Sequence, residues 1–385
     1  MFMKRLYFRI YIFIFIINFF LISQYIAQSL DTFTPVLDDS IAYSSKISDF
    51  PDLSDEIIVD EDSNPNTHRI SISFRGSGKH QIFGNKYNDS LPIYSIVNEE
   101  RSYILNKEIW LNNSYTTVIF EWKEKIFDCS YMFSGLSTIE NINFTEFNFK
   151  RIINMTCMFC NNNNLKYIEF GNLDTSSVIS MEKMFYECIS LISLDLSSFK
   201  MNKVENIDSM FEGCSQLNNI VFSQYKTKSL KSMNRAFYYS YSLTSLDLSN
   251  FDISEVSNMN YLFYRCERLI SLNLSSFHEN KYYINASYMF YNCQNLLSLD
   301  LSNFETSKVI NMAYMFYQCY YLKDVKNMKF NLSSVISMNR MFYCCHSIES
   351  IDLSNFFESK KSLDMSYLKI LMIFFHQICI ILYRI

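Results

Sequence analysis

Apolar residues recur along most of the chain with a fixed period. The most regular position is a phenylalanine, whose successive occurrences lie 26 residues apart except for one interval of 27. These anchor phenylalanines are Phe133, Phe159, Phe185, Phe211, Phe237, Phe263, Phe290, Phe316 and Phe342. A period of this length is typical of stacked supersecondary units, none of which can bury its apolar side alone. The sequence therefore predicts a solenoid of about nine coils over residues 127–360.

Each repeat has two halves with different periodicities. In the first half, Leu194 and Leu196 flank a polar residue, and alternation with a period of two predicts a short strand with one side buried. In the second half, Val204, Ile207 and Met210 are followed by the anchor phenylalanine, and this spacing places them on one face of a helix. We therefore expect the α/β plan of a leucine-rich repeat, with short parallel strands on one face and short helical turns on the other.

The repeats resemble those of the BspA-like leucine-rich-repeat surface proteins. The segments Leu243–Phe251 and Val309–Cys319 carry the resemblance. Where the asparagine of an ordinary leucine-rich repeat would end the strand segment, this chain has Phe199, Phe251, Phe277, Phe304 and Phe356. We expect these phenylalanines to fill the core in place of an asparagine ladder. The resemblance implies display at the cell surface and adhesion rather than catalysis, and it does not indicate the ligand.

Four further segments flank the repeats. Residues 1–27 have a basic start and an apolar run, which predicts a secretory signal peptide, with an uncleaved signal anchor as the alternative. Residues 28–66 form an acidic linker, interpreted as a solvated spacer or an ionic docking tail. Residues 67–126 alternate like strands and predict a β-rich N-terminal cap. Residues 361–385 are an apolar tail, with three readings: a degenerate C-terminal cap, a removed lipid-anchor signal or an error of gene prediction.

Six of the eleven cysteines share one position in the repeat, three residues after the anchor. They are Cys188, Cys214, Cys266, Cys293, Cys319 and Cys345, and Ser240 holds the position in the remaining coil from Phe185 onward. We expect buried, reduced thiols that act as small apolar plugs. The alternative is a set of disulfides between adjacent coils, Cys188–Cys214, Cys266–Cys293 and Cys319–Cys345.

The strand position expected to face outward is often acidic. It holds Asn143, Glu169, Asp195, Val221, Asp247, Asn273, Asp300, Lys326 and Asp352. We expect the carboxylates to accept hydrogen bonds from nearby serines or backbone, with a weak calcium-binding stripe as the alternative. The chain has no nucleophile motif, glycine-rich loop, tetrahedral metal pattern or basic patch. We therefore predict a binding protein without enzymatic activity, cofactor, metal or nucleic-acid partner.

Tyrosine recurs at two positions that helix geometry would place in solvent, two residues before and one residue after the anchor. Three consecutive coils have tyrosine at both, namely Tyr261, Tyr264, Tyr288, Tyr291, Tyr314 and Tyr317. Tyrosine is enriched at recognition surfaces, so we predict that these six bind a partner, whereas the alternative is packing between coils. The expected protein is secreted or on the cell surface and binds a protein or a glycan. A self-associating structural component is the alternative function, and membrane attachment through a terminus stays open.

Overall fold

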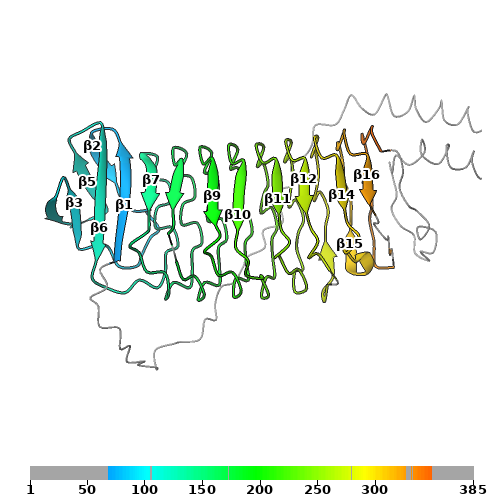
Figure 1. Cartoon of the computed structure of the whole chain (residues 1–385), viewed down its shortest axis with the longest axis horizontal. Coiled ribbons are helices and arrows are strands. Elements are labelled where there is room, and N and C mark those ends of the chain that lie inside the picture. The colour runs from blue at the N-terminus through cyan, green and yellow to red at the C-terminus, as the bar shows by residue number, and fades with distance from the viewer. Residues whose placement is uncertain are drawn as a thin grey trace, which may run out of the picture. The chain divides into compact units, whose positions relative to one another are not determined.

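The structure is a computed structural model, and it describes residues 68–104, 106–171, 173–278, 280–326, 331 and 333–348. The predicted signal peptide, acidic linker and apolar tail lie outside the described residues, as do Asp352 and Phe356. The described part is a β-solenoid that begins with a group of antiparallel strands (Figure 1).

Six strands make up the N-terminal cap. They are β1 (His68–Arg75), β2 (Gly78–Gln81), β3 (Tyr94–Val97), β4 (Glu100–Tyr103), β5 (Glu108–Leu111) and β6 (Tyr115–Trp122). One sheet has the order β4-β3-β6-β1-β7-β8, and β2 pairs with β5 in a separate antiparallel sheet. In the larger sheet, β1 pairs antiparallel with β7 (Ile139–Asn143), the first strand of the solenoid. The cap sheet thus continues directly into the strands of the repeats.

Short parallel strands line one side of the solenoid. After β7 they are β8 (Tyr167–Glu169), β9 (Ser193–Leu196), β10 (Asn219–Phe222), β11 (Ser245–Asp247), β12 (Ser271–Asn273), β14 (Ser298–Asp300) and β16 (Asp324–Lys326). Two more short strands, β13 (Ile284–Asn285) and β15 (Val309–Asn311), pair elsewhere in the coil. Residues one repeat apart face each other, as in Leu194 opposite Ile220. The predicted strands, their parallel pairing and the 26-residue period are confirmed. We call this side the strand wall.

The segments around the anchor phenylalanines are not helical, so the prediction of helical turns and of an α/β fold is wrong. Every second backbone N–H closes a turn onto the carbonyl three residues earlier, as from Met184 to Met181 at 3.2 Å. The N–H groups between them donate to the next coil, as from Lys183 to Asp208 at 2.9 Å. The segments are therefore runs of β-turns joined sideways like a parallel sheet. Within the described residues, the helical structure is limited to the 3₁₀ turn η2 (Thr306–Lys308).

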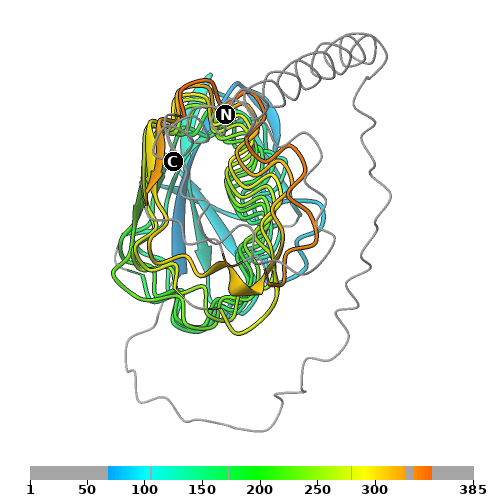
Figure 2. The ribbon, with the colours of Figure 1, turned by 90° about the vertical axis from the view of Figure 1, so that its right-hand side faces the viewer.

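Left-handed backbone repeats at two positions in each of these segments, two residues before and two residues after the anchor. In the coil of Phe185 they are Lys183 and Glu187, with φ of 54° and 53°. This conformation is uncommon for residues other than glycine and does not occur within a helix. Chain reversal at these corners directs Met184, Phe185 and Cys188 inward, where all three are fully buried. We call this side the turn wall, and Figure 2 shows it across the cross-section from the strands.

Phenylalanine rings form the centre of the solenoid. Successive anchors from Phe133 to Phe342 stack with ring centroids 5.2 to 5.9 Å apart and planes within 16° of parallel. Each such pair contributes about 0.5–1.5 kcal/mol beyond the burial of its area. The strand-ending Phe199, Phe251, Phe277 and Phe304 are also buried, as predicted. An asparagine and serine ladder does exist, but it lies five residues before the anchor, where Asn206 Oδ1 accepts from the N–H of Asp208 at 2.8 Å.

The repeated cysteines are hydrogen-bond donors. Each thiol donates to the carbonyl of the anchor in the preceding coil, as from Cys266 Sγ to Phe237 O at 3.1 Å. Ser240 makes the same bond to Phe211 O at 3.0 Å, and Asn162 to Phe133 O at 2.7 Å. The apolar-plug interpretation is therefore wrong, since the position requires a small donor. Cys188, Cys214, Cys266, Cys293 and Cys319 are not in disulfides, as predicted, and since each of the three proposed pairings includes one of them, none of the pairings forms. Burial raises the pKa of the Cys188 thiol to about 12, so it stays protonated and able to donate.

Candidate binding surface on the turn wall

The outward side chains of the turn wall form two adjacent rows. Row A consists of the residues two before each anchor: Tyr131, Cys157, Lys183, Ser209, Arg235, Tyr261, Tyr288, Tyr314 and Arg340. Row B consists of the residues one after it: Ser134, Cys160, Tyr186, Glu212, Tyr238, Tyr264, Tyr291, Tyr317 and Tyr343. Row A residues are left-handed corners. Most of their side chains are half-buried at the surface, whereas Cys157 and Ser209 are buried.

The six predicted tyrosines lie together in the C-terminal half of these rows. In row A, Tyr288 stacks between Tyr261 and Tyr314, with centroids 4.6 Å away on both sides. Row B stacks over five coils, from Tyr238 to Tyr343, at 4.6 to 5.0 Å. The two rows also touch, with centroids 5.5 to 5.8 Å apart within each coil. The result is a double ladder of tyrosine rings.

Arginines close both ends of the row A stack. The Arg235 guanidinium lies 5.3 Å from the ring centroid of Tyr261, and that of Arg340 lies 5.7 Å from the ring of Tyr314. Arg340 Nη1 also donates to the Tyr314 hydroxyl at 3.1 Å. A cation over an aromatic face is attracted by the ring quadrupole. Row A therefore accepts either tyrosine or arginine at the same corner.

The tyrosines are half-buried, so the expectation that they point fully into solvent is wrong. Each ring is covered by its neighbours along and across the rows, while its outer edge stays accessible. Burial is the main cause that raises the pKa of the Tyr264 phenol to about 12. Burial likewise raises the pKa of Tyr261 and Tyr317, so the hydroxyls are neutral donors and acceptors at physiological pH.

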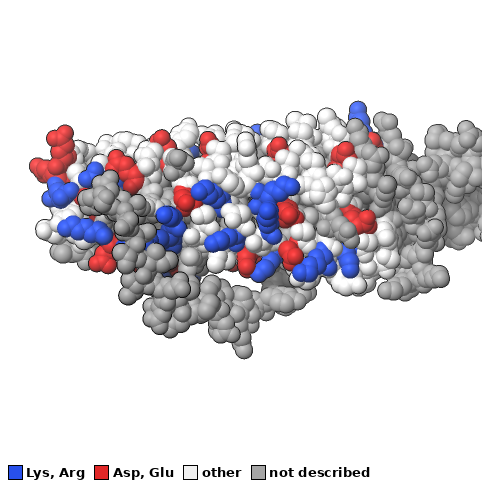
Figure 3. Space-filling view, turned by 60° about the horizontal axis from the view of Figure 1, so that its bottom comes forward, with Lys and Arg blue, Asp and Glu red and all other residues white. Residues whose placement is uncertain are grey.

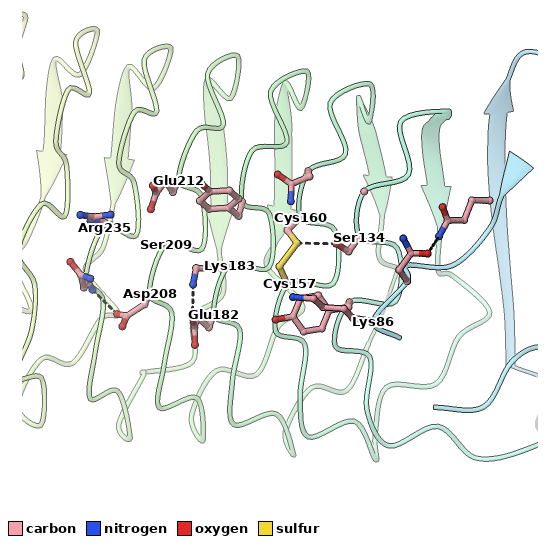
Figure 4. Close-up of a pocket in the computed structure, with 17 residues that line it drawn as sticks. Lys86, Ser134, Cys157, Cys160, Glu182, Lys183, Asp208, Ser209, Glu212 and Arg235 are labelled. Carbon is pink, nitrogen blue, oxygen red and sulfur yellow. Dashed lines mark hydrogen bonds and ion pairs between the residues drawn. A yellow bond between two sulfur atoms is a disulfide. The ribbon is translucent and has the colours of Figure 1, made fainter. Parts of the chain in front are cut away.

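The N-terminal half of the turn wall is hollowed and charged. The hollow has a volume of about 730 Å³ and is lined by residues of both rows and by the acidic neighbours of row A (Figure 4). Lys183 Nζ pairs with Glu182 at 3.0 Å. Asp208 accepts from the Ser232 hydroxyl and from the N–H of Asn234. Burial raises the pKa of Asp208 to about 6, with the nearby Glu182 carboxylate acting in the same direction and the two hydrogen bonds opposing it.

A disulfide joins the two rows inside the hollow, between Ser134 on one side and Lys183 on the other. Cys157 of row A and Cys160 of row B are bonded to each other within one coil (Figure 4). Reasoning from the sequence missed this bond because it considered only the cysteines of the repeated position. The signal was available, since the two cysteines occupy the same pair of positions as Tyr261 and Tyr264, whose rings are in contact.

The strand wall carries the predicted outward carboxylates. Asp195, Asp247 and Asp300 are exposed, and each Oδ1 accepts from the N–H two residues later at 2.9 Å. Hydrogen bonding to backbone is thus confirmed for these three. Among the described residues no group of three or more His, Cys, Asp or Glu side chains is placed to hold a metal ion.

Charge is mixed on the described surface. Lysines and arginines alternate with acidic residues over the face in Figure 3, without a field of one sign. Several charges pair between coils, as Lys231 with Glu205 at 2.8 Å and Lys200 with Asp174 at 3.1 Å. The part of the chain that the structure describes contains no helix with the length and apolar character of a membrane span.

Comparison with known families gives one result. The sequence model of a family described as "Mycoplasma protein of unknown function, DUF285" matches residues 127–245, 194–299 and 281–369. Together these matches span residues 127–369, which is more than half of the chain and includes every anchor phenylalanine. No curated protein matches the sequence. The chain therefore belongs to the DUF285 repeat family, whose function is unknown.

Proposed function

We propose that the protein is a secreted or cell-surface repeat protein of the BspA-like leucine-rich-repeat type that binds a macromolecular partner through the turn wall. The double tyrosine ladder of rows A and B is the observation that carries this proposal. The partner is a protein or a glycan, and the activity is recognition or adhesion without catalysis. The basic and apolar start of the chain supports a secretory route.

The ladder has the physical properties of a recognition surface. Tyrosine offers a large amphipathic contact area at a low cost in conformational entropy. Here the rings are already fixed by stacking at 4.6 to 5.0 Å, so binding a partner would immobilise few additional rotamers. Neutral hydroxyls at the outer edge add directional hydrogen bonds. The surface is continuous across neighbouring coils, which suits an extended ligand.

The experiment compares capture of partners by three forms of the purified chain on an array of glycans and matrix proteins. The test variant replaces Tyr261, Tyr288 and Tyr314 by serine. The matched control makes the same substitution at three exposed tyrosines outside both rows, Tyr167, Tyr225 and Tyr283. We expect the test variant to lose capture and the control to keep it. Equal capture by all three forms would exclude the ladder as the binding surface.

Stability requires its own control because the ladder rings are half-buried. Serine removes the stacking contacts of row A, so we expect the melting temperature of the test variant to fall, rather than stay unchanged as the solvent-exposed interpretation implied. Replacing the same three tyrosines by phenylalanine keeps the stack and removes only the hydroxyls. If the phenylalanine variant keeps the wild-type melting temperature but binds more weakly, the loss of affinity is due to the missing hydroxyls.

Self-association is the second candidate function. The equal spacing of row A, 4.6 Å on both sides of Tyr288, would let the rows of two copies pack against each other in register. Sedimentation of the full chain over a range of concentrations separates the candidates. A monomer at all concentrations supports binding of a different partner, whereas concentration-dependent filaments that the serine variant loses support a structural role.

A further inference from the structure

A second groove lies in the N-terminal cap, between the β3–β4 hairpin and β5. Its volume is about 760 Å³, and it shares no lining residue with the turn wall. Two of its lining residues, Trp110 of β5 and Tyr103 of β4, are the most exposed large apolar side chains in the described part of the chain, at 74% and 71%. Single exposed rings are normal at a protein surface, but two that line the same groove mark a candidate ligand site.

The exposure of Trp110 is not a general property of tryptophan in this protein. The chain has two tryptophans. The other, Trp122, is fully buried in the same cap, and its Nε1 donates to the Ser90 carbonyl at 2.8 Å. Trp110 lies in the separate β2–β5 sheet, where Ile109 and Leu111 face the cap interior more than it does. The strand thus presents one large ring to solvent at the groove.

A buried hydroxyl without a partner lines the same groove. Thr116 of β6 is 6% exposed, and its Oγ1 makes no hydrogen bond in the structure. Thr116 is the first residue on the buried side of β6, followed by the fully buried Val118 and Phe120. It therefore lies where this apolar core meets the groove. A buried hydroxyl left unpaired is costly, and such groups are rare in native proteins. The oxygen is closed to solvent in this structure, so a ligand hydroxyl would become its partner after a small movement of the side chains at that end of the groove.

The electrostatic character of the groove points to an uncharged ligand. None of the described residues that line it is Lys or Arg, which disfavours phosphorylated or sulfated ligands. Two carboxylates line the groove, which further disfavours an anionic ligand: Glu108 is paired with Lys79 Nζ at 2.7 Å, and Glu100 is exposed to solvent. Side-chain amides of Asn98, Asn112 and Asn113 also line the groove, and each amide both donates and accepts hydrogen bonds.

We propose that this groove binds a neutral saccharide. The apolar C–H face of a sugar ring packs against an aromatic ring, here Trp110 with Tyr103 at the facing wall. The sugar hydroxyls both donate and accept, which matches the amides and the unpaired Thr116 hydroxyl. An extended peptide added to the exposed edge strand β4 is the competing occupant. It would use the backbone of β4 and would leave Trp110 and Thr116, on β5 and β6, without a role.

Intrinsic fluorescence of the full chain tests this proposal. The probes are neutral trisaccharides of glucose, galactose, mannose and N-acetylglucosamine, titrated while tryptophan alone is excited. We expect at least one to change the emission of Trp110. We expect Trp110→Ala to weaken binding by about 30-fold, measured by titration calorimetry because this variant lacks the reporting ring. The matched control is Phe127→Ala, which removes an exposed ring directly after the cap and outside the groove and should leave affinity unchanged.

A second variant separates loss of binding from loss of folding. Thr116→Val keeps the shape of the side chain and removes the unpaired hydroxyl. We expect it to weaken saccharide binding by about 3- to 10-fold while leaving the melting temperature equal or higher. The proposal is overturned if no neutral trisaccharide binds, if Trp110→Ala binds as tightly as wild type, or if an extended peptide binds at β4 instead. The proposed function of the turn wall stands or falls separately, because its variants are on different residues.

Discussion

Single positions in this repeat are defined by one hydrogen bond or one backbone angle. The position three residues after the anchor illustrates this, because Asn162, Ser240 and the cysteines differ in polarity but are all small donors to the preceding anchor carbonyl. The carbonyl accepts from this side chain in the core, where water cannot replace the donor. The frequency of cysteine therefore reflects a small donor that also tolerates an apolar environment.

Substitution of Cys266 tests this account. Cys266→Ser keeps a donor, as Ser240 does in the preceding coil, so we expect most of the stability to remain. Cys266→Ala leaves the Phe237 carbonyl with only its turn hydrogen bond from the Ser240 N–H, at 3.2 Å, and should lower the free energy of unfolding by about 0.5–1.5 kcal/mol. Denaturant midpoints of the two variants give the comparison, with the same pair at Cys293 as a replicate. An alanine variant as stable as the serine variant would refute the donor requirement.

Asp208 makes stability depend on pH. Its folded pKa is raised to about 6 from an ordinary value of 3.8, so the native state holds the proton at pH values where the unfolded chain has lost it. Stability is therefore lost as the pH rises from about 4 to 6, by up to about 3 kcal/mol. Asp208→Asn keeps the acceptor for Ser232 and Asn234 without the charge.

We expect Asp208→Asn to be more stable than wild type at pH 7 and equally stable near pH 4. Unfolding by denaturant at both pH values measures the difference, and the comparison cancels the contribution of Glu212, whose pKa is also raised by burial. A variant that is less stable than wild type at pH 7 would show that the Asp208 charge is stabilising.

At the scale of the element, the sequence predicted the strands correctly and the turn wall incorrectly. The strands are correct because alternation at Leu194 and Leu196 has a single structural explanation. The spacing of Met184, Phe185 and Cys188 has two possible structural explanations, because a helix and a run of β-turns both place these apolar side chains on one side. Propensity did not decide between them, because the left-handed corners are occupied by Lys183, Tyr261 or Arg235 rather than mainly by glycine.

The candidate surface was found for a reason that is only partly right. Positions two before and one after the anchor do face outward, but corner geometry and not helix geometry puts them there. The charged hollow was out of reach for the same reason, because its lining residues come from several coils that become neighbours only in the turn wall. The cap groove depends on how two sheets meet, which no local pattern specifies.

Glycine and alanine at Lys183 distinguish the two local structures directly. In a helix, glycine is less stable than alanine by about 1 kcal/mol. At a left-handed corner the order reverses, because an L-residue there costs about 1–2 kcal/mol and glycine does not. Both variants remove the ion pair with Glu182, so this contribution cancels. We expect Lys183→Gly to have a higher denaturant midpoint than Lys183→Ala. The opposite order would support a helix at this position.

At the scale of the molecule, each coil contacts its neighbours through equivalent ladders of hydrogen bonds and rings. Stability of such an array is approximately a sum over coils and their interfaces. One ladder lies in the strand wall, one runs through the anchor phenylalanines and two lie in the rows of the turn wall. All of them depend on the same 26-residue register.

Deletion of one repeat tests that dependence. Removing residues 186–211 takes out 26 residues and brings Glu212 directly after Phe185, so every ladder position downstream keeps its place. We expect this shorter chain to fold, with circular dichroism like that of wild type. Removing residues 187–211 takes out 25 and shifts every later side chain by one position, which should prevent folding. Equal folding of the two deletions would contradict a solenoid held by register.

The most direct test of the turn wall as the binding surface is the affinity of Tyr288→Arg for a partner captured by the wild-type chain. Row A naturally holds arginine against tyrosine at Arg235 and Arg340, so the fold accommodates this change in the middle of the ladder. The account predicts an unchanged melting temperature with a dissociation constant weaker by about 30-fold, because an arginine breaks the continuous aromatic surface at its centre. An unchanged dissociation constant in the folded variant would contradict it.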